Sequence, residues 1–419
     1  MIIVKAETVA VVAEVHVTVG QAVSEGTVLI STELMKMRHD IRAPASGIVE
    51  AMHVAVGDEL QVSDALVTLS PADVADQNAG PREIARPDLD EYHARMALLS
   101  DGARADAVAE RHAQGFRTAR ENIDDLFDAG SFVEYGALAV AAQRTTKDTE
   151  TLKTRTQGDG IICGTGTVNG RPVAAMAVDY MVMAGTQGYN HHRKMDRLIE
   201  VAARSEMPIV LFAEGGGGRP NDDDVAPLMA AWLNVTSFRQ FAAYPGPKIG
   251  IVAGYCFAGN AALYGVCDVR IATENSWIGM GGPAMIEGGG LGRVAPTEIG
   301  PSDIQVKNGV IDLRTVDEAE AVVATKALLG LHQSTDAWSA PQIDLQHIVP
   351  TDRLVAYDMR RAVEGIADTD SLVELRRDFG VGLITAFGRI YGRAVGIVAN
   401  NPLHLGGAID ADAADKGAR

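Results

Sequence analysis

The first 70 residues consist of short valine-rich runs in which apolar and polar positions alternate, a pattern typical of β-strands. Two parts of this segment are alike: Val-His-Val-Thr-Val-Gly at 15–20 corresponds to Met-His-Val-Ala-Val-Gly at 52–57, and each copy leads into another apolar strand. The repeat predicts a small all-β sandwich barrel with quasi-twofold symmetry over residues 1–70. The segment from Leu34 to Ala45, between the two copies, is expected to form the connecting hairpin.

The pattern changes three times further along the chain. Residues 71–86 are rich in Pro, Gly, Asp and Asn and predict a linker. From Leu89 to Phe127, apolar residues recur at helical spacing among charged ones, which predicts two amphipathic helices. Beyond residue 155, apolar strands alternate with glycine loops and helical stretches, as in an α/β fold.

A second repeat connects distant parts of the chain. The strand that opens with Gly-Arg-Pro-Val at 170–173 resembles the one that opens with Gly-Arg-Ala-Val at 392–395. Such an echo predicts a duplicated α/β unit, with one copy over 87–335 and the beginning of another over 336–419. Because the sequence ends at Arg419, soon after the second copy starts, we expect that copy to be truncated.

Charge and cysteine content narrow the function classes. A formal net charge of −18 argues against nucleic-acid or anionic-membrane partners, which require basic faces. The three cysteines are odd in number and have no metal spacing, and no His-Cys-Asp cluster has metal spacing either, so we expect no disulfide framework, no metal site and a cytoplasmic location. The stretch 249–267 has no charged residue, but its glycines and Asn260 favour a buried strand turning into a helix over a membrane span.

The tripeptide Met35-Lys36-Met37 stands where the two β halves are expected to meet in a turn. Two methionines at a hairpin tip are uncommon without a function, because exposed apolar groups usually contact a partner. The alternative interpretation is an ordinary surface lysine between two mobile apolar residues.

This segment is similar to biotin carboxyl carrier (biotinyl) domains, in which the lysine of Met-Lys-Met is biotinylated. The resemblance covers residues 3–70 and includes the Ala-Pro-x-Ser-Gly stretch at 43–47. It implies covalent biotin on Lys36, with Met35 and Met37 beside it, and a biotin protein ligase as a partner. Leu34 takes the place of the small residue usual before the first methionine. A lipoyl domain shares this fold and is the alternative.

Two glycine-containing loops follow apolar strands. Glu214-Gly-Gly-Gly-Gly-Arg219 comes directly after the strand expected at 208–212, and Gly254-Tyr-Cys-Phe-Ala-Gly-Asn260 opens an expected helix. Glycines leave backbone N–H groups uncovered, and a helix N-terminus adds oriented amides. Such donors can stabilise a developing oxyanion. A flexible surface loop is the simpler interpretation of a lone glycine run, but the second loop favours a site.

Together the loops resemble the oxyanion and acyl-CoA loops of biotin-dependent acyl-CoA carboxyltransferases (acetyl- and propionyl-CoA carboxylase β type), which have a crotonase-like (ClpP/crotonase) α/β fold. Related patterns occur at 185–194, 281–290 and 400–410, so the resemblance covers about residues 85–419. It implies that the oxyanion donors are Gly216, Gly217 and Gly218, and that the acyl-CoA pocket is lined by Ala258 and Gly259. A second oxyanion pair in this family grips the biotin ureido carbonyl, and no matching glycine-alanine loop precedes Arg419.

An otherwise acidic chain has a local cationic cluster, formed by His191, His192, Arg193, Lys194 and Arg197. The cluster either recognises the CoA phosphates, since Arg and Lys suit phosphate, or is a solvated helix face. Arg219 either fixes the glycine loop or contacts the ligand.

The resemblance implies transfer of a carboxyl group from carboxybiotin on Lys36 to the α-carbon of an acyl-CoA such as acetyl-CoA or propionyl-CoA. The transferase positions the reactants and supplies N–H donors, without a side-chain base. A biotin carboxylase subunit is expected as a partner, because the chain has no Gly-x-x-x-x-Gly-Lys loop. Full-length family members are homo-oligomers. The alternatives are a biotin-dependent acyl-CoA decarboxylase subunit and a non-catalytic biotin carrier or scaffold.

Overall fold

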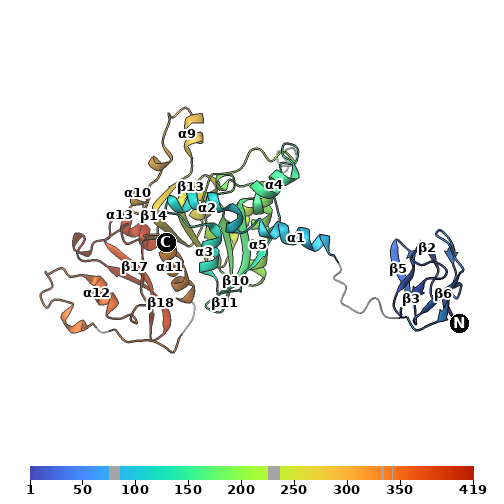
Figure 1. The fold of residues 1–419 in the computed structure, drawn as a ribbon. Coiled ribbons are helices and arrows are strands. Elements are labelled where there is room, and N and C mark those ends of the chain that lie inside the picture. The colour runs from blue at the N-terminus through green and yellow to red at the C-terminus, as the bar shows by residue number, and fades with distance from the viewer. Residues whose placement is uncertain (75–84, 225–235, 332–334, 342) are drawn as a thin grey trace. The chain divides into compact units, whose positions relative to one another are not determined.

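The computed structural model describes residues 1–74, 85–224, 236–331, 335–341 and 343–419 and divides the chain into two compact units, Met1–Pro87 and Asp88–Arg419 (Figure 1). Most of the predicted linker, 71–86, lies outside the described residues. The three cysteines are free and buried. Within the described ranges, none of the helices combines the length and the apolar character that crossing a bilayer requires.

The N-terminal unit is built from two four-stranded antiparallel sheets that enclose one hydrophobic core. One sheet has the order β1 (Ile2–Lys5), β8 (Ala65–Pro71), β6 (Gly47–Met52), β3 (Ala22–Val23). The other has the order β5 (Met37–Arg42), β4 (Val28–Leu34), β2 (Ala10–Val15), β7 (Glu59–Leu60). β4 and β5 pair from Leu34↔Met37 onward, so the predicted hairpin is confirmed.

The predicted quasi-twofold symmetry extends to side-chain contacts. His16 Nε2 lies 2.8 Å from the hydroxyl of Ser31, and the equivalent His53 Nε2 lies 2.8 Å from the hydroxyl of Thr68. The two histidines also donate their backbone N–H groups to equivalent carbonyls, those of Leu29 and Leu66. These histidines therefore stabilise the two halves of the barrel in the same way.

The large unit is organised around a seven-stranded sheet of order β15-β14-β13-β12-β11-β10-β9, parallel from β11 to β15. Its strands are β9 (Val133–Tyr135), β10 (Ile161–Val168), β11 (Arg171–Val178), β12 (Ile209–Phe212), β13 (Lys248–Phe257), β14 (Val269–Gly279) and β15 (Leu313–Thr315). Every residue of β12 is buried, because helices cover both faces of the sheet. One face packs against α5 (Tyr189–Arg204), α7 (Ser237–Ala243) and α8 (Gly259–Gly265). The other packs against α3 (Ala119–Leu126) and α11 (Glu318–Leu331).

The segment ahead of this sheet forms three helices, so the prediction of two helices between Leu89 and Phe127 was wrong. They are α1 (Pro87–Ala97), α2 (Ala105–Ala113) and α3, with a 3-10 turn at Asp101–Arg104. Gly115 adopts a left-handed φ of 82° after α2, and Thr118 then starts α3 through a capping box with Glu121. Gly115 and the Thr118 capping box therefore end one helix and start the next within a stretch whose apolar spacing is continuous.

The remaining helices are short and connect the larger elements: α4 (Thr149–Arg155), α9 (Pro283–Gly288) and α10 (Ser302–Gln305). A three-stranded antiparallel sheet follows α11 and has the order β16 (Val373–Leu375), β17 (Leu383–Ile390), β18 (Arg393–Asn400). It is accompanied by α12 (Met359–Glu364) and α13 (Ala411–Ala418). The uncharged stretch 249–267 forms β13 and α8, as predicted.

Strands β16-β17-β18 resemble β9-β10-β11 in their antiparallel order and turn contacts, which supports the predicted duplication. Asp128 accepts hydrogen bonds from the N–H groups of the turn at 169–170 (3.0 and 2.8 Å), and Asp368 accepts them from the turn at 391–392 (2.9 and 2.7 Å). The likeness continues past the hairpin, because residues 183–185 and 405–407 all have left-handed φ values. The first copy has a longer connection between its first two strands, which contains α4 and Asp159.

The hydrogen bonds of Asp128 to the hairpin turn can be tested. The hydrogen bond from the Thr167 hydroxyl, followed by that from the Gly170 N–H, lowers the pKa of the Asp128 carboxyl below its ordinary value of 3.8. A lowered folded-state pKa stabilises the fold above the unfolded-state value, and the gain is lost as the pH falls through the folded-state value. We therefore expect Asp128→Asn to lower Tm near neutral pH, with the deficit shrinking below about pH 4.

Thermal melts from about pH 7 to about pH 3 would measure this deficit, with Asp124→Asn, an exposed carboxylate of the same segment, as control. A deficit that stayed constant over the whole range would contradict the assignment of the effect to the Asp128 charge.

Candidate active site

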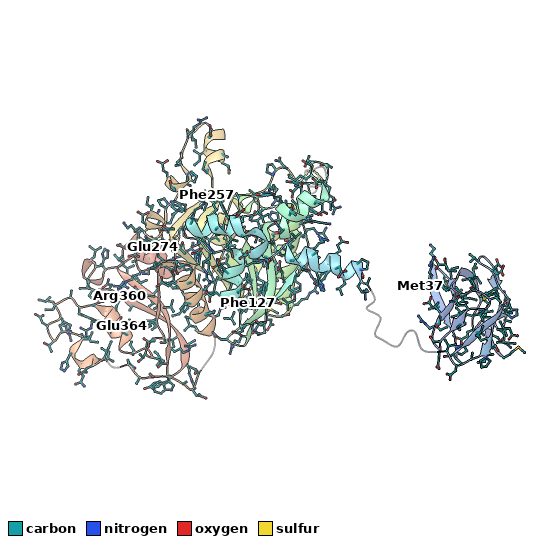
Figure 2. The ribbon with its side chains drawn as sticks, viewed as in Figure 1. Met37, Phe127, Phe257, Glu274, Arg360 and Glu364 are labelled. Carbon is teal, nitrogen blue, oxygen red and sulfur yellow. The ribbon has the colours of Figure 1, made fainter. Side chains whose placement is uncertain are left out.

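The predicted modification site lies in a strained two-residue turn. Met35 and Lys36 connect β4 to β5 and both have left-handed φ values, 51° and 65°. Turns of this kind normally use Asn or Gly at these positions, because a side chain disfavours the conformation. Met35 is 89% exposed and Met37, labelled in Figure 2, is 65% exposed. Exposed apolar side chains in a strained turn are typical of a functional tip.

The two glycine-containing loops meet at the carboxyl ends of β12 and β13. Gly215 donates to the carbonyl of Tyr255 (2.5 Å), and Phe257, labelled in Figure 2, donates to the carbonyl of Gly215 (2.9 Å). A Cβ on Gly217 would lie 2.8 Å from the Ala258 Cβ, so only glycine fits there. The same position is 3.4 Å from the amide nitrogen of Gly259, which places Gly217 beside the start of α8.

At the point where the two loops meet, the amide groups of Gly217, Gly218 and Gly259 have no protein acceptor among the described residues. The Gly216 N–H, by contrast, donates to the carbonyl of Ala184 (3.2 Å). This bond occupies the N–H inside the fold, which argues against the expected donor role of Gly216. Gly217 and Gly218 stay candidates, and Gly259 adds an amide from the second loop.

The turn between β13 and α8 is sharp. Ala258 has φ 49° and ψ −116°, an unusual conformation for a residue with a side chain, and its N–H donates to the carbonyl of Gly279 (3.0 Å). Strand β13 therefore ends in a fixed corner, and the first amide of α8, that of Gly259, points away from the helix.

Arg219 is buried, and its contacts favour the first of its two predicted roles, fixing the glycine loop. Its Nη1 lies 2.5 Å from an Asp159 carboxylate oxygen and 3.4 Å from one of Asp222, and its Nη2 donates to the carbonyl of Thr186 (2.8 Å). These contacts use both terminal nitrogens inside the fold. We therefore expect it to position the loop and not to contact the ligand.

The predicted cationic cluster does not form as one surface. His191, His192 and Lys194 lie on the buried face of α5, and Arg193 and Arg197 are exposed. Lys194 Nζ donates to the backbone carbonyls of Gly158 (2.9 Å) and Ile161. Burial lowers the pKa of His192 to about 4, so its ring is neutral at pH 7. The expected solvated helix face is therefore wrong for the buried members, because the helical period turns them toward the sheet. Their burial also argues against phosphate recognition by the whole cluster.

Sequence reasoning missed a buried ion pair beneath the glycine loop. The Arg111 guanidinium binds both carboxylate oxygens of Glu214 (3.1 and 2.5 Å) and lies 5.5 and 5.8 Å from the ring centres of Phe116 and Tyr180. Burial raises the pKa of Glu214 to about 7, while Arg111 opposes this shift. A Cβ on Gly254 would lie 2.6 Å from a Glu214 oxygen, so this glycine makes room for the pair. The available signal was an acidic residue directly before a glycine run.

The pair provides a stability test. Removing Arg111 leaves the buried Glu214 carboxyl without its partner, so that it must stay charged or take up a proton, and either change costs stability; we expect Arg111→Met to lower the free energy of unfolding by about 3–5 kcal/mol. Adding Glu214→Gln replaces the carboxyl with a neutral amide and should restore at least half of the loss. Urea unfolding of the two variants and the wild type at neutral pH would measure both changes. An unfolding free energy of R111M equal to that of the wild type would show that the pair does not support the loop.

Comparison with known proteins places both units in families. The carboxyl transferase domain family matches residues 110–419, and the family described as biotin-requiring enzyme matches residues 2–69. The β4 subunit of a biotin-dependent long-chain acyl-coenzyme A carboxylase from Mycobacterium tuberculosis is 32% identical over 346 residues, which cover 79% of this chain and 64% of that subunit. The chain therefore spans less than two thirds of that relative.

Solved structures agree with this result. A single-chain, multi-domain long-chain acyl-CoA carboxylase matches with a TM-score of 0.76 and 46% identity, over 99% of this chain and 41% of that one. The transcarboxylase 12S hexamer, solved with methylmalonyl-coenzyme A bound, matches with a TM-score of 0.69 and 28% identity over 80% of this chain and 68% of that one.

These matches confirm the predicted crotonase-like transferase fold, the all-β biotinyl domain and biotin as the cofactor. The chain belongs to the carboxyl transferase domain family and carries, at its N-terminus, a domain of the biotin-requiring enzyme family.

Proposed function

We propose that the chain is the carboxyltransferase component of a biotin-dependent acyl-CoA carboxylase and that it moves a carboxyl group from biotin on Lys36 to the α-carbon of an acyl-CoA. The observation that carries this proposal is the group of three amides without protein acceptors, those of Gly217, Gly218 and Gly259. They belong to two loops in contact at the carboxyl ends of parallel strands, where α/β folds commonly bind ligands.

The residues of the hairpin tip suit covalent biotin. Lys36 is exposed on a two-residue turn, and its amine forms no ion pair with the barrel among the described residues. Met35 and Met37 project beside it and offer a ligase an apolar surface. When attached to the Lys36 amine as an amide, biotin carries the carboxyl group that is transferred.

The transferase loops would act on the thioester. Negative charge develops on the thioester oxygen when the α-proton leaves, and the amides of Gly217, Gly218 and Gly259 would donate to that oxygen. Each well-placed donor of this kind contributes roughly 3–4 kcal/mol to transition-state stabilisation. The loop residues with polar or titratable side chains are Glu214, Arg219, Cys256 and Asn260, which are buried, and the partly buried Tyr255, and the proposal assigns none of them the role of base.

Substrate and partners follow from the family and from the relatives. Acetyl-CoA and propionyl-CoA are the first substrates to test, and the long-chain carboxylase relatives make a long acyl chain the next. A biotin carboxylase, a biotin protein ligase and further copies of the same chain are the proposed partners, and the cytoplasm is the proposed location. A biotin-dependent decarboxylase and a non-catalytic carrier are the outcomes that would replace this proposal.

Modification of Lys36 can be tested directly. After co-expression with a biotin protein ligase, we expect the intact mass to increase by one biotin in the wild type and not in Lys36→Ala. Lys5→Ala, an exposed lysine of the same barrel, should gain the biotin like the wild type. No mass gain in the wild type with active ligase would contradict the assignment of Lys36.

Replacement of Gly217 tests the transferase loop. A Cβ at this position would overlap Ala258 at 2.8 Å, so we expect Gly217→Val to abolish carboxyl transfer from malonyl-CoA to free biotin while Lys36 is still biotinylated. Gly265→Val is the control, because a Cβ at this exposed glycine meets nothing within 4 Å. Full transfer by G217V would remove Gly217 from the site. A wild type inactive in transfer but biotinylated would indicate a carrier without catalysis.

A further inference from the structure

Asn260 is a fully buried side chain in the first turn of α8, directly beside the glycine loop. Its Nδ2 lies within hydrogen-bond distance of three backbone carbonyl oxygens, those of Gly216 (2.6 Å), Glu214 (2.9 Å) and Gly185 (3.1 Å). Its Oδ1 accepts from the Gln187 side-chain amide (2.8 Å). An amide NH2 has two protons, so Asn260 shares them among three carbonyls of two separate loops.

The bond to Gly216 determines where the next amide points. In a trans peptide the C=O of one residue and the N–H of the next lie in one rigid plane and point in opposite directions. Because Asn260 holds the Gly216 carbonyl inside the fold, the Gly217 N–H must point the other way, out of the protein interior. The same reasoning explains why this N–H has no protein acceptor among the described residues.

The neighbouring peptide is oriented in a similar way. The Gly217 carbonyl accepts from the backbone N–H of Gln187 (3.0 Å), which directs the Gly218 N–H outward. Gln187 is itself tied to Asn260 through its side chain. Asn260 therefore acts on Gly217 directly and on Gly218 through Gln187.

We propose that Asn260 is a positioning residue that aims the Gly217 and Gly218 amides at the thioester oxygen. This inference rests on the proposed carboxyltransferase function and names the residue that makes the amides of the same site usable. Glycines have no side chain to restrict rotation, so a four-glycine run needs an outside anchor to keep its amides pointing one way. Asn260 is that anchor for the middle of the run, while Arg111 and Arg219 hold its two ends through Glu214 and Asp159.

Asn260→Asp is the primary test, because aspartate has the same shape and, when ionised, has no proton to donate to the three carbonyls. Infrared difference spectra of ¹³C-carbonyl propionyl-CoA report hydrogen bonding to the thioester oxygen. We expect the wild type to lower the carbonyl stretching frequency on binding and N260D to lose at least half of that shift. Transfer of the carboxyl group from malonyl-CoA to free biotin should lose about 10²-fold in kcat, with KM changed less than about threefold.

Two further variants separate positioning from general destabilisation. Thr325→Val removes a fully buried hydroxyl hydrogen bond in α11, away from the loops, and should leave the carbonyl shift and kcat at wild-type values. Gln187→Leu keeps the Asn260 bonds to the three carbonyls but removes the side-chain hydrogen bond from Gln187 to Asn260. It should give a carbonyl shift and a kcat between those of the wild type and N260D. This variant decides the question if N260D does not fold.

The outcomes are distinct. Wild-type shift and kcat in N260D, or in Q187L when N260D is unfolded, would overturn the role of Asn260 and leave the proposed function intact. An N260D loss reproduced by T325V would also overturn it, because the effect would then come from stability alone. A wild type that binds propionyl-CoA without any carbonyl shift would overturn the proposed oxyanion site and, with it, this inference.

Discussion

The rigid peptide plane is the constraint on which the candidate site depends. A carbonyl that is hydrogen-bonded inside the protein turns the N–H of the same peptide outward, and three peptides at the ends of β12 and β13 are fixed in this way. The Gly216 carbonyl bonds to Asn260, the Gly217 carbonyl to the Gln187 N–H, and the Ala258 carbonyl to the Ala262 N–H. The outward amides of Gly217, Gly218 and Gly259 thus result from satisfying buried carbonyls, and burial of unpaired carbonyls would be costly. The site is preorganised by the same bonds that stabilise the fold.

The surroundings of the loops hold this arrangement. Two buried ion pairs, Arg111–Glu214 and Arg219–Asp159, fix the two ends of the glycine run. Asp159 comes from the longer connection between the first two strands of the first copy, and the second copy has no such connection. The two sets of strands share a hairpin framework, and the longer connection in the first supplies an anchor for the glycine loop. In the N-terminal unit, too, the fold fixes the backbone of the functional residue: the barrel holds the strained turn that exposes Lys36.

Sequence reasoning succeeded where function depends on adjacent residues. The Met-Lys-Met hairpin, the two glycine loops and the duplicated strands could all be predicted, because each is a local pattern of residue types. It failed where function depends on residues brought together by the fold. Arg111 lies 103 residues from Glu214, and Asn260 lies 44 residues from Gly216. Neither contact can therefore be predicted from a local sequence pattern. The cationic cluster on α5 was misread because charge was considered without helical phase, and the phase buries Lys194 and His192. The Gly216 N–H was assigned to a ligand because its acceptor, the Ala184 carbonyl, belongs to another loop.

A structure of the chain with a bound acyl-CoA that keeps its thioester carbonyl would test whether the amides are preorganised. We expect a carbonyl oxygen about 2.7–3.1 Å from the amide nitrogen of Gly259 and from that of Gly217 or Gly218, with the Asn260 contacts to the three carbonyls unchanged. A thioester oxygen bound elsewhere, or a glycine loop whose peptides turn over when the acyl-CoA binds, would contradict the claim that buried carbonyl bonds prepare this site in advance.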